Sequence, residues 1–290
     1  MKNEMIPVPA GSGAGRSIGA LLIDAGKLKP EDAEAVLRLQ KEKNLRFGDA
    51  AIELGLITRA DLDLAMSRQF DYPYLIPGES KVSEEVVAAY DPFSPQVEAL
   101  RALRAQLMLR WFDHDAARTA LAIVSAARGE GRSYIAANLA VVFSQLGERT
   151  LLIDADLRHP RQHELFGMEN RVGLSSILSG RAGLDAMHRI PGLLGLSVLP
   201  AGVLPPNPQE LLARAPFAQL LEQLAGQFDV VLLDSPPAGD TADAQTLAVR
   251  AGAALVVVRK NSSRTWRVRG ISDSVAQAKA TIVGAVLNDF

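Results

Sequence analysis

Two glycines and a serine stand close together between an apolar run and a helix-forming run. Gly129, Gly131 and Ser133 lie in the stretch Val124–Ala140, which reads VSAARGEGRSYIAANLA. Glycines let the backbone turn so that successive N–H groups face one point, and the positive end of a following helix strengthens the attraction for an anion. A serine at this position can bind Mg²⁺ through its hydroxyl. The stretch therefore predicts a cradle for phosphate groups.

This cradle departs from the P-loop pattern G-x-x-x-x-G-K-[ST] at two positions. Ala126 replaces the first glycine and Arg132 replaces the lysine. Arginine carries a planar guanidinium on a longer side chain, so its charge does not occupy the place of a lysine ammonium. Arg132 therefore casts more doubt on phosphoryl transfer than on nucleotide binding. Taken alone, the stretch fits an ordinary strand-to-helix turn equally well.

Two later apolar runs end in carboxylates. Arg149–Arg158 carries Asp154 and Asp156, and Phe228–Pro237 carries Asp234. Side chains two apart on a strand share a face, and the carboxyl ends of parallel strands are where ligands bind, here next to the phosphate loop of the neighbouring strand. Strand ends with helix-capping aspartates are the alternative. The three segments together indicate a nucleotide site.

Buried strands that alternate with helices predict the scaffold that positions these residues. We expect an α/β domain at residues 93–290, with a doubly wound, mainly parallel sheet of P-loop NTPase type. A small all-α helical repeat domain precedes it at residues 17–75. Residues 76–92 are expected to form a linker, and residues 1–16, rich in Gly, Pro and Ser, a flexible tail.

Two motifs in this α/β region carry a resemblance to a known family. LLIDADLR followed by His159 and Pro160, and LPAGVLPPNPQELL at Leu199–Leu212, resemble the bacterial tyrosine kinases over residues 92–290. Among these, the chain is most similar to the EpsG-type chain-length-determinant kinases of exopolysaccharide clusters. The second motif matches the family pattern at Gly202, Pro205, Pro206, Asn207, Pro208, Glu210 and Leu211.

That resemblance implies ATP and Mg²⁺ as cofactors and assigns roles to the carboxylates. Asp154 would orient or deprotonate a tyrosine hydroxyl, Ser133 and Asp156 would bind Mg²⁺, and Asp234 would hold a metal-bound water, so that Ser133, Asp156 and Asp234 form the expected metal site. Phosphoryl transfer needs mainly such positioning and charge neutralisation. The catalytic candidates are Asp154, Asp156 and Arg132. The ATP-binding candidates are Gly129, Glu130, Gly131, Arg132, Ser133, Tyr134 and Asn288.

Family members usually carry a tyrosine-rich tail that receives phosphate, and this sequence ends in VGAVLNDF. Its tyrosines are Tyr72, Tyr74, Tyr90 and Tyr134. Tyr134 follows the P-loop serine, where a packed aromatic is the simpler interpretation. We therefore expect the acceptor at one of the other three tyrosines or in another protein.

Three charged residues ahead of the nucleotide domain fall on one helix flank. Glu98, Arg101 and Arg104 are spaced three apart and resemble the E-x2-R-x2-R element through which these kinases pack into rings. The alternative is a solvated helix with a weak local ion pair. The resemblance implies a homo-oligomer.

The front of the chain contains an internal repeat. Ser17–Gln40 aligns with Arg46–Gln69, and each copy predicts two short helices. Gly26 and Gly55 would end the first helix of each copy, Pro30 suits a first helical turn, and Thr58 with Asp61 forms a capping box. The identical pairs are Gly19/Gly48, Ile23/Ile52, Gly26/Gly55, Asp32/Asp61 and Gln40/Gln69.

The second copy resembles the unit found in the N-terminal domain of secretion ATPases of the GspE and MshE type. In the MshE branch two such units bind cyclic di-GMP, so the resemblance makes Arg46, Gly48, Gly55 and Gln69 candidate ligands. Ser17 occupies the place of the arginine in the first copy. A helical module that docks onto a partner protein carries equal weight.

Composition limits the remaining classes. The chain has 290 residues, no cysteine and a net charge of −2, which excludes disulfides and thiolate catalysis and gives no reason to expect nucleic acid as a partner. No apolar run approaches bilayer-spanning length and no signal peptide opens the sequence. We expect a cytoplasmic protein, peripheral at the inner membrane through a partner.

Three functions therefore compete. The first is an ATP-dependent tyrosine kinase that regulates exopolysaccharide chain length and export with a separate Wzz-type membrane co-polymerase. The second is an ATP-binding switch of polysaccharide assembly that does not phosphorylate tyrosine, which Arg132 and the missing tail favour. The third, a MinD- or ParA-like positioning ATPase, is disfavoured because Ala127 replaces the signature lysine of that group.

Overall fold

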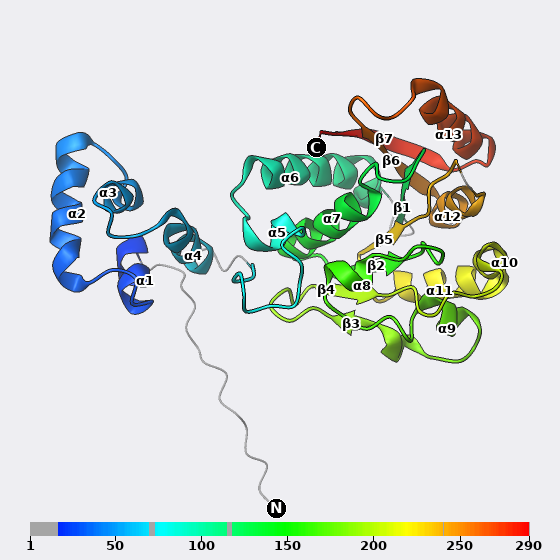
Figure 1. Ribbon diagram of the computed structural model, residues 1–290, viewed down its shortest axis with the longest axis horizontal. Coiled ribbons are helices and arrows are strands. Elements are labelled where there is room, and N and C mark those ends of the chain that lie inside the picture. The colour runs from blue at the N-terminus through cyan, green and yellow to red at the C-terminus, as the bar shows by residue number, and fades with distance from the viewer. Residues whose placement is uncertain (1–16, 70–72, 115–117, 240, 290) are drawn as a thin grey trace, which may run out of the picture. The chain divides into compact units, whose positions relative to one another are not determined.

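The protein is described by a computed structural model, which covers residues 17–69, 73–114, 118–239 and 241–289 (Figure 1). The chain divides into two compact units, residues 1–73 and 74–290. The predicted tail at residues 1–16 lies outside the described residues. Among the residues that are described, no helix combines the length and the apolar character needed to cross a bilayer.

The N-terminal unit contains two helix pairs, as the repeat predicts. Thr58 and Asp61 form the expected capping box, since the Thr58 N–H donates to Asp61 Oδ2 at 3.0 Å and the Asp61 N–H to Thr58 Oγ1 at 3.2 Å. Pro30 occupies the first turn of its helix. The helices are α1 (Ile18–Asp24), α2 (Pro30–Lys43), α3 (Phe47–Glu53) and α4 (Arg59–Gln69).

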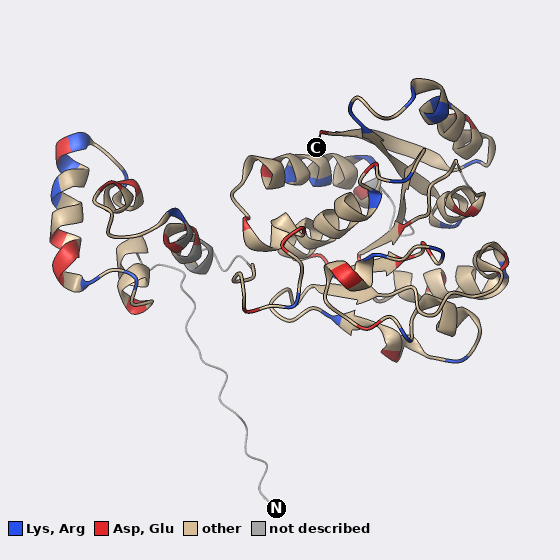
Figure 2. Ribbon diagram, in the orientation of Figure 1, with Lys and Arg blue, Asp and Glu red and all other residues tan. Residues whose placement is uncertain are grey.

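The glycines of the repeat have packing and turn roles. A Cβ on Gly48 would lie 2.4 Å from the Leu62 side chain, so only glycine lets α3 approach α4 this closely. Gly26 and Gly55 follow α1 and α3 with φ of 65° and 68°, which favours glycine. Helix α2 carries acidic residues in its first turn and lysines in its last, which complements its dipole (Figure 2).

The second unit is built on a seven-stranded sheet in the order β3-β4-β2-β5-β1-β6-β7. Every pair of neighbours is parallel except β3 with β4, which confirms the expected mainly parallel sheet. One expectation is wrong: the strand of Asp154, β2, does not adjoin β1, because β5 lies between them. The strands are β1 (Ala120–Ser125), β2 (Thr150–Asp154), β3 (His188–Arg189), β4 (Leu196–Leu199), β5 (Val230–Asp234), β6 (Ala253–Arg259) and β7 (Thr281–Asn288).

Helices cover both faces of this sheet, so the fold is doubly wound as predicted (Figure 1). Alternate residues of β1 enter opposite cores: Leu121 belongs to the core that includes Leu139, and Ala122 to the core that includes Leu247. The helices are α5 (Val87–Tyr90), α6 (Pro95–Arg110), α7 (Arg132–Leu146), α8 (Gln162–Leu165), α9 (Leu174–Leu178), α10 (Pro208–Ala213), α11 (Ala215–Ala225), α12 (Asp243–Ala251) and α13 (Thr265–Gln277), with short 3-10 helices at Phe112–His114 and Leu184–Ala186.

Residues 76–92 do not form the expected linker but pack against the α/β unit. Val86 and Ala88 are fully buried in the core beside α7. The Ala88 N–H donates to Asn138 Oδ1 at 2.9 Å, and the Asn138 amide donates to Glu85 O at 3.2 Å. Val82, Val86, Ala88 and Ala89 of this segment belong to the same core as the buried residues of α7. The structural boundary therefore falls at residues 73 and 74.

Candidate active site

The predicted phosphate cradle lies between the end of β1 and the start of α7. Gly129 and Gly131 adopt φ of 76° and 96°, conformations that other residues rarely take, so the loop needs both glycines. Glu130 is buried inside the loop, where its Oε2 accepts a hydrogen bond from the Ala127 N–H at 2.7 Å. Its other oxygen accepts from the Ser263 hydroxyl. The Glu130 side chain thus holds the loop in shape.

Two further hydrogen bonds join the cradle to the ends of β6 and β7. Arg259 Nη1 donates to Gly129 O at 3.1 Å, and Asn288 Nδ2 donates to Glu130 O at 3.2 Å. The structure therefore brings Asn288 to the loop, 158 positions away in the sequence from Glu130.

Arg132, at the usual lysine position, is turned inward beneath the loop. Its Nε donates to Ser235 O at 2.8 Å, and its Nη1 donates to Ala127 O at 2.9 Å and also to the Ser125 hydroxyl. Only 8% of the residue is exposed. The guanidinium therefore ties the loop to the segment after β5.

Asp154 and Asp234 are side by side, because β2 pairs with β5 in a register that sets these two residues opposite each other. Both are fully buried. Burial, and then the charge of Asp234, raise the pKa of Asp154 well above its ordinary value. Burial also raises the pKa of Asp234, opposed by the charge of Arg132 and by hydrogen bonds from Gln162 and Ser133.

Asp156 and Ser133 complete the predicted set. Asp156 follows the end of β2, and its Oδ1 accepts from the N–H groups of Arg158 at 3.2 Å and His159 at 2.9 Å. The charge of Asp156 raises the pKa of Asp154 and of Asp234, and the Ser133 side chain lowers the pKa of Asp234. The structure therefore gathers Ser133, Asp154, Asp156 and Asp234 at one edge of the sheet.

Several residues that the motifs did not single out also build the site. Gln162 contacts Asp234, and Arg158 Nε donates to the buried carboxylate of Asp243 at 2.8 Å. Ser235 receives the Arg132 side chain. The sequence gives no spacing signal for these contacts, since each joins distant segments.

The residues present suit a nucleotide-bound Mg²⁺. Three buried oxygens there, Asp154 Oδ1, Asp234 Oδ1 and Gln162 Oε1, have no hydrogen-bond partner. Buried acceptors of this kind are satisfied by ordered waters or by a cation with its waters. In the described parts of the chain no three Asp, Glu or His side chains form a cluster that could enclose a metal by themselves. Mg²⁺ does not need one, because it usually keeps several waters and takes one or two protein ligands besides phosphate oxygens.

The predicted tyrosines differ in their surroundings. Tyr134 is half-buried against the core, and burial raises its pKa. The Tyr90 hydroxyl donates to Val82 O. Tyr72 lies outside the described residues. Tyr134 is therefore a packed aromatic, which agrees with the simpler interpretation of the sequence. None of the contacts described for it involves the cradle.

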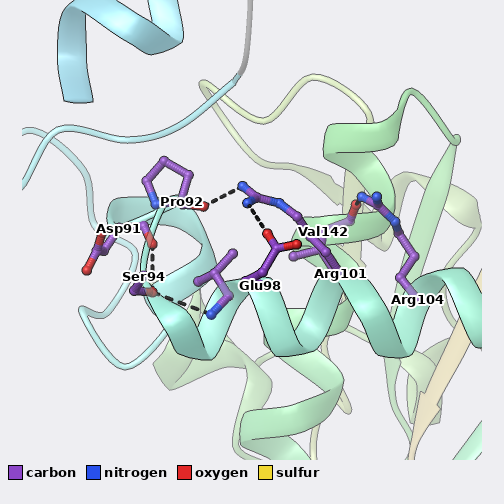
Figure 3. A network of polar contacts seen from close by, with 8 residues as sticks. Asp91, Pro92, Ser94, Glu98, Arg101, Arg104 and Val142 are labelled. Carbon is purple, nitrogen blue, oxygen red and sulfur yellow. Dashed lines mark hydrogen bonds and ion pairs between the residues drawn. The ribbon is translucent and has the colours of Figure 1, made fainter. Parts of the chain in front are cut away.

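The three residues of the predicted ring element lie on α6 (Figure 3). Arg101 bonds to Glu98 Oε2 at 3.1 Å and donates to Pro92 O. Arg104 Nη1 donates to Val142 O at 2.6 Å, which joins α6 to α7. These arginines thus have partners within the chain, and their role in assembly stays a prediction.

Replacing both arginines tests that role. We expect the Arg101→Ala, Arg104→Ala variant to shift from an oligomer to a monomer in light scattering, because an interface depends on a few charged anchors. Arg110→Ala, on the same helix, serves as the control. An unchanged mass for a variant that keeps its melting temperature would contradict the ring prediction.

The candidate cyclic di-GMP residues occupy different environments in the N-terminal unit. Arg46 is exposed at the start of α3, and Gly48 is buried against Leu62. Gly55 is exposed at a turn, and Gln69 ends α4. Gly48 therefore has a packing reason for being glycine, whereas Arg46 is available to a ligand.

Comparison with known proteins identifies the α/β unit. The ParA family model, described as an NUBPL iron-transfer P-loop NTPase, matches residues 116–289. Tyrosine-protein kinase YwqD of Bacillus subtilis is 35% identical over 209 residues, which cover 72% of this chain and 87% of YwqD. Tyrosine-protein kinase Etk of Escherichia coli is 35% identical over 202 residues, but the chain spans 28% of its length. This chain likewise spans 28% of the length of the putative tyrosine-protein kinase EpsB of Ralstonia solanacearum.

Solved structures agree with this assignment. The kinase domain of Escherichia coli Etk is 32% identical with a TM-score of 0.68, over 76% of this chain and 85% of that one. The cell division ATPase MinD of Pyrococcus furiosus, at 26% identity and a TM-score of 0.52 over 59% of this chain and 72% of that one, shares the fold. The glycine loop, the strand-end aspartates and these relatives together show that the chain belongs to the bacterial tyrosine-protein kinase family of P-loop NTPases.

Proposed function

We propose that this protein transfers the γ-phosphoryl group of ATP to a tyrosine hydroxyl. The observation that carries the proposal is the pair of buried carboxylates, Asp154 and Asp234, placed side by side at strand ends. Phosphoryl transfer requires such groups to align a nucleophile and to hold a cation near the phosphates.

The residues of the site would divide three tasks in this reaction: binding the phosphates, holding the cation and accepting the proton. The N–H groups of the glycine loop and the start of α7 would bind the phosphates. Ser133, Asp156 and Asp234 would hold Mg²⁺, which neutralises phosphate charge when bound. Asp154 would accept the proton of the tyrosine hydroxyl, and its raised pKa brings it closer to the range in which a general base is effective.

Phosphosite mass spectrometry tests the activity directly. Purified protein is incubated with Mg²⁺-ATP and with the cytoplasmic tail of its membrane partner, alongside the Asp154→Asn variant. Phosphotyrosine that is absent from the variant would support the kinase and identify the acceptor. ATP binding without any phosphotyrosine would reject it.

The biological setting that we propose rests on the sequence resemblance. Two of the relatives are named putative tyrosine-protein kinases EpsB and CapB. The kinase-family motif at Leu199–Leu212 and the resemblance to EpsG-type kinases support a role in exopolysaccharide chain length and export. In that role the protein would act in the cytoplasm, held at the inner membrane by a Wzz-type co-polymerase.

One observation favours a second function, an ATP-dependent switch that does not transfer phosphate. The Arg132 guanidinium is bound by three protein acceptors, Ser125, Ala127 and Ser235, rather than directed away from the loop. Loss of a single well-placed donor typically lowers a rate by about 10²–10³-fold. The mass spectrometry experiment separates the two functions.

For the N-terminal unit we propose cyclic di-GMP as the ligand, supported by the exposed Arg46 and by the repeat itself. Calorimetric titration should show binding that Arg46→Ala weakens by tenfold or more, because hydrogen bonds to charged groups are worth about 1.5–3 kcal/mol. Arg59→Ala, which removes an exposed arginine paired with Asp63 on α4, is the control. Absence of heat from the unmodified protein would retire this proposal in favour of a docking module.

A further inference from the structure

Gln162 touches three of the residues assigned to the ATP site. It begins the short helix α8 and is fully buried. Its side-chain Nε2 donates to Asp234 Oδ2 at 2.7 Å and to Ser133 O at 3.1 Å. Its backbone N–H donates to Asp154 Oδ2 at 2.8 Å. One residue thus connects β2, β5 and the start of α7.

The orientation of this amide is determined by chemistry. Both hydrogens of Nε2 face oxygen acceptors, so the reversed amide would place its carbonyl oxygen against the Asp234 carboxylate. Gln162 Oε1 is therefore the free atom, and it is buried without a hydrogen-bond partner. A buried acceptor without a donor is costly unless a ligand or an ordered water satisfies it.

Two other orphaned acceptors accompany this oxygen. Asp154 Oδ1 and Asp234 Oδ1 are also buried without partners, and Gln162 is bonded to the other oxygen of each of these carboxylates. A group of acceptors with no donor suits a hydrated divalent cation, whose waters are strong donors. Residues that orient metal ligands in this way commonly tune metal affinity.

We propose that Gln162 is a positioning residue for the divalent cation: its amide orients the Asp234 carboxylate, and its Oε1 accepts a hydrogen bond from a water of the cation. This inference rests on the proposed function, because it concerns the same ATP site. It adds a residue outside the glycine loop and the strand-end aspartates.

The loop that carries Gln162 has other anchors, so the amide can be removed without releasing the loop. The Arg161 N–H donates to Asp154 Oδ2 at 2.9 Å, and Arg161 pairs with Glu85 at 2.6 Å. Arg158 pairs with Asp243 at 2.8 Å. A substitution at Gln162 therefore acts mainly on the orientation of Asp234.

The test measures nucleotide binding rather than activity. Gln162→Met keeps the length of the side chain and removes its donors and acceptor. With a fluorescent ADP analogue, we expect the Mg²⁺ concentration needed for half-maximal binding to rise about 10–100-fold. Affinity without Mg²⁺ should change less than about twofold, because the phosphate-facing N–H groups are untouched. Gln145→Met is the matched control, since Gln145 is a buried amide on α7 that donates to Ala88 O.

The outcomes separate this inference from the proposed function. An unmodified protein that binds no nucleotide would reject the function itself. Mg²⁺-dependent binding that is the same in the unmodified protein and in Gln162→Met would overturn the inference. Should Gln162→Met not fold, Gln162→Asn decides: it keeps the amide but withdraws it by one methylene, and the same Mg²⁺-selective loss is expected.

Discussion

Asp154→Asn is expected to lower the rate of tyrosine phosphorylation by about 10²–10⁴-fold, the usual contribution of a general base. An amide has nearly the same shape but cannot accept the proton of the tyrosine hydroxyl. Initial rates with Mg²⁺-ATP and the acceptor identified by mass spectrometry would measure the loss. A variant that keeps more than a tenth of the rate would show that Asp154 is not the base.

The same substitution should stabilise the nucleotide-free and metal-free protein. Burial raises the pKa of Asp154 in the folded chain, so the folded state binds this proton more tightly than the unfolded state. The free energy of unfolding therefore falls as the pH rises from the ordinary value of 3.8 through the raised pKa. An asparagine at this position carries no such penalty. The melting temperature of Asp154→Asn should therefore exceed that of the unmodified protein, most clearly at neutral pH.

Asp229 provides a control of opposite sign. The hydrogen bond from Arg149 lowers the pKa of Asp229, so its contribution is present above the ordinary pKa and is lost as the pH falls. Asp229→Asn should therefore destabilise the protein slightly at neutral pH, the direction opposite to Asp154→Asn. Melting curves of both variants between pH 5 and pH 8 would separate a specific effect of the buried carboxylate from a general effect of lost charge.

Arg132→Met should produce the largest loss of stability in the site, about 3–5 kcal/mol, because several buried acceptors lose a charged donor at once. The change leaves Ser235 O, Ala127 O and the Ser125 hydroxyl without their donor, and it removes the cation whose charge stabilises the Asp234 carboxylate. For a chain of this size the melting temperature would fall by roughly 10 °C. Thermal unfolding and nucleotide titration would measure the two consequences.

Two comparisons make this result interpretable. Arg128→Met removes an exposed arginine of the same loop and should change stability by less than about 0.5 kcal/mol. Arg132→Lys keeps a positive charge but loses the planar fork, so it should lie between the unmodified protein and Arg132→Met. Equal stability of Arg132→Met and Arg128→Met would mean that the inward contacts of Arg132 contribute nothing.

The structure contains the features for which the sequence carries the strongest local signals. Gly129 and Gly131 were predictable because a tight turn with positive φ requires glycine, whatever the surroundings. The strands that end in Asp154 and Asp234 were predictable because buried parallel strands need continuous apolar runs. The helix pairs of residues 17–69 were predictable from their caps and repeat.

Contacts between distant segments were not predictable in this way. The sequence predicted a linker at residues 76–92 because their apolar stretches are short. These stretches become part of the core only because α7 covers them. Asp154 and Asp234 are neighbours because β5 inserts between β1 and β2, and strand order leaves no trace in local spacing. No sequence pattern pointed to Gln162, because its role depends on three partners from other elements.

The sequence by itself determined the kinds of groups that this site contains: a glycine turn, a hydroxyl and three strand-end carboxylates. Only the tertiary structure decided where the Arg132 guanidinium points and which carboxylates share one buried environment. The physical reason is that φ preference and hydrophobic periodicity act within a few residues, whereas the direction of a long side chain and the pKa of a buried acid depend on whatever distant segments surround them.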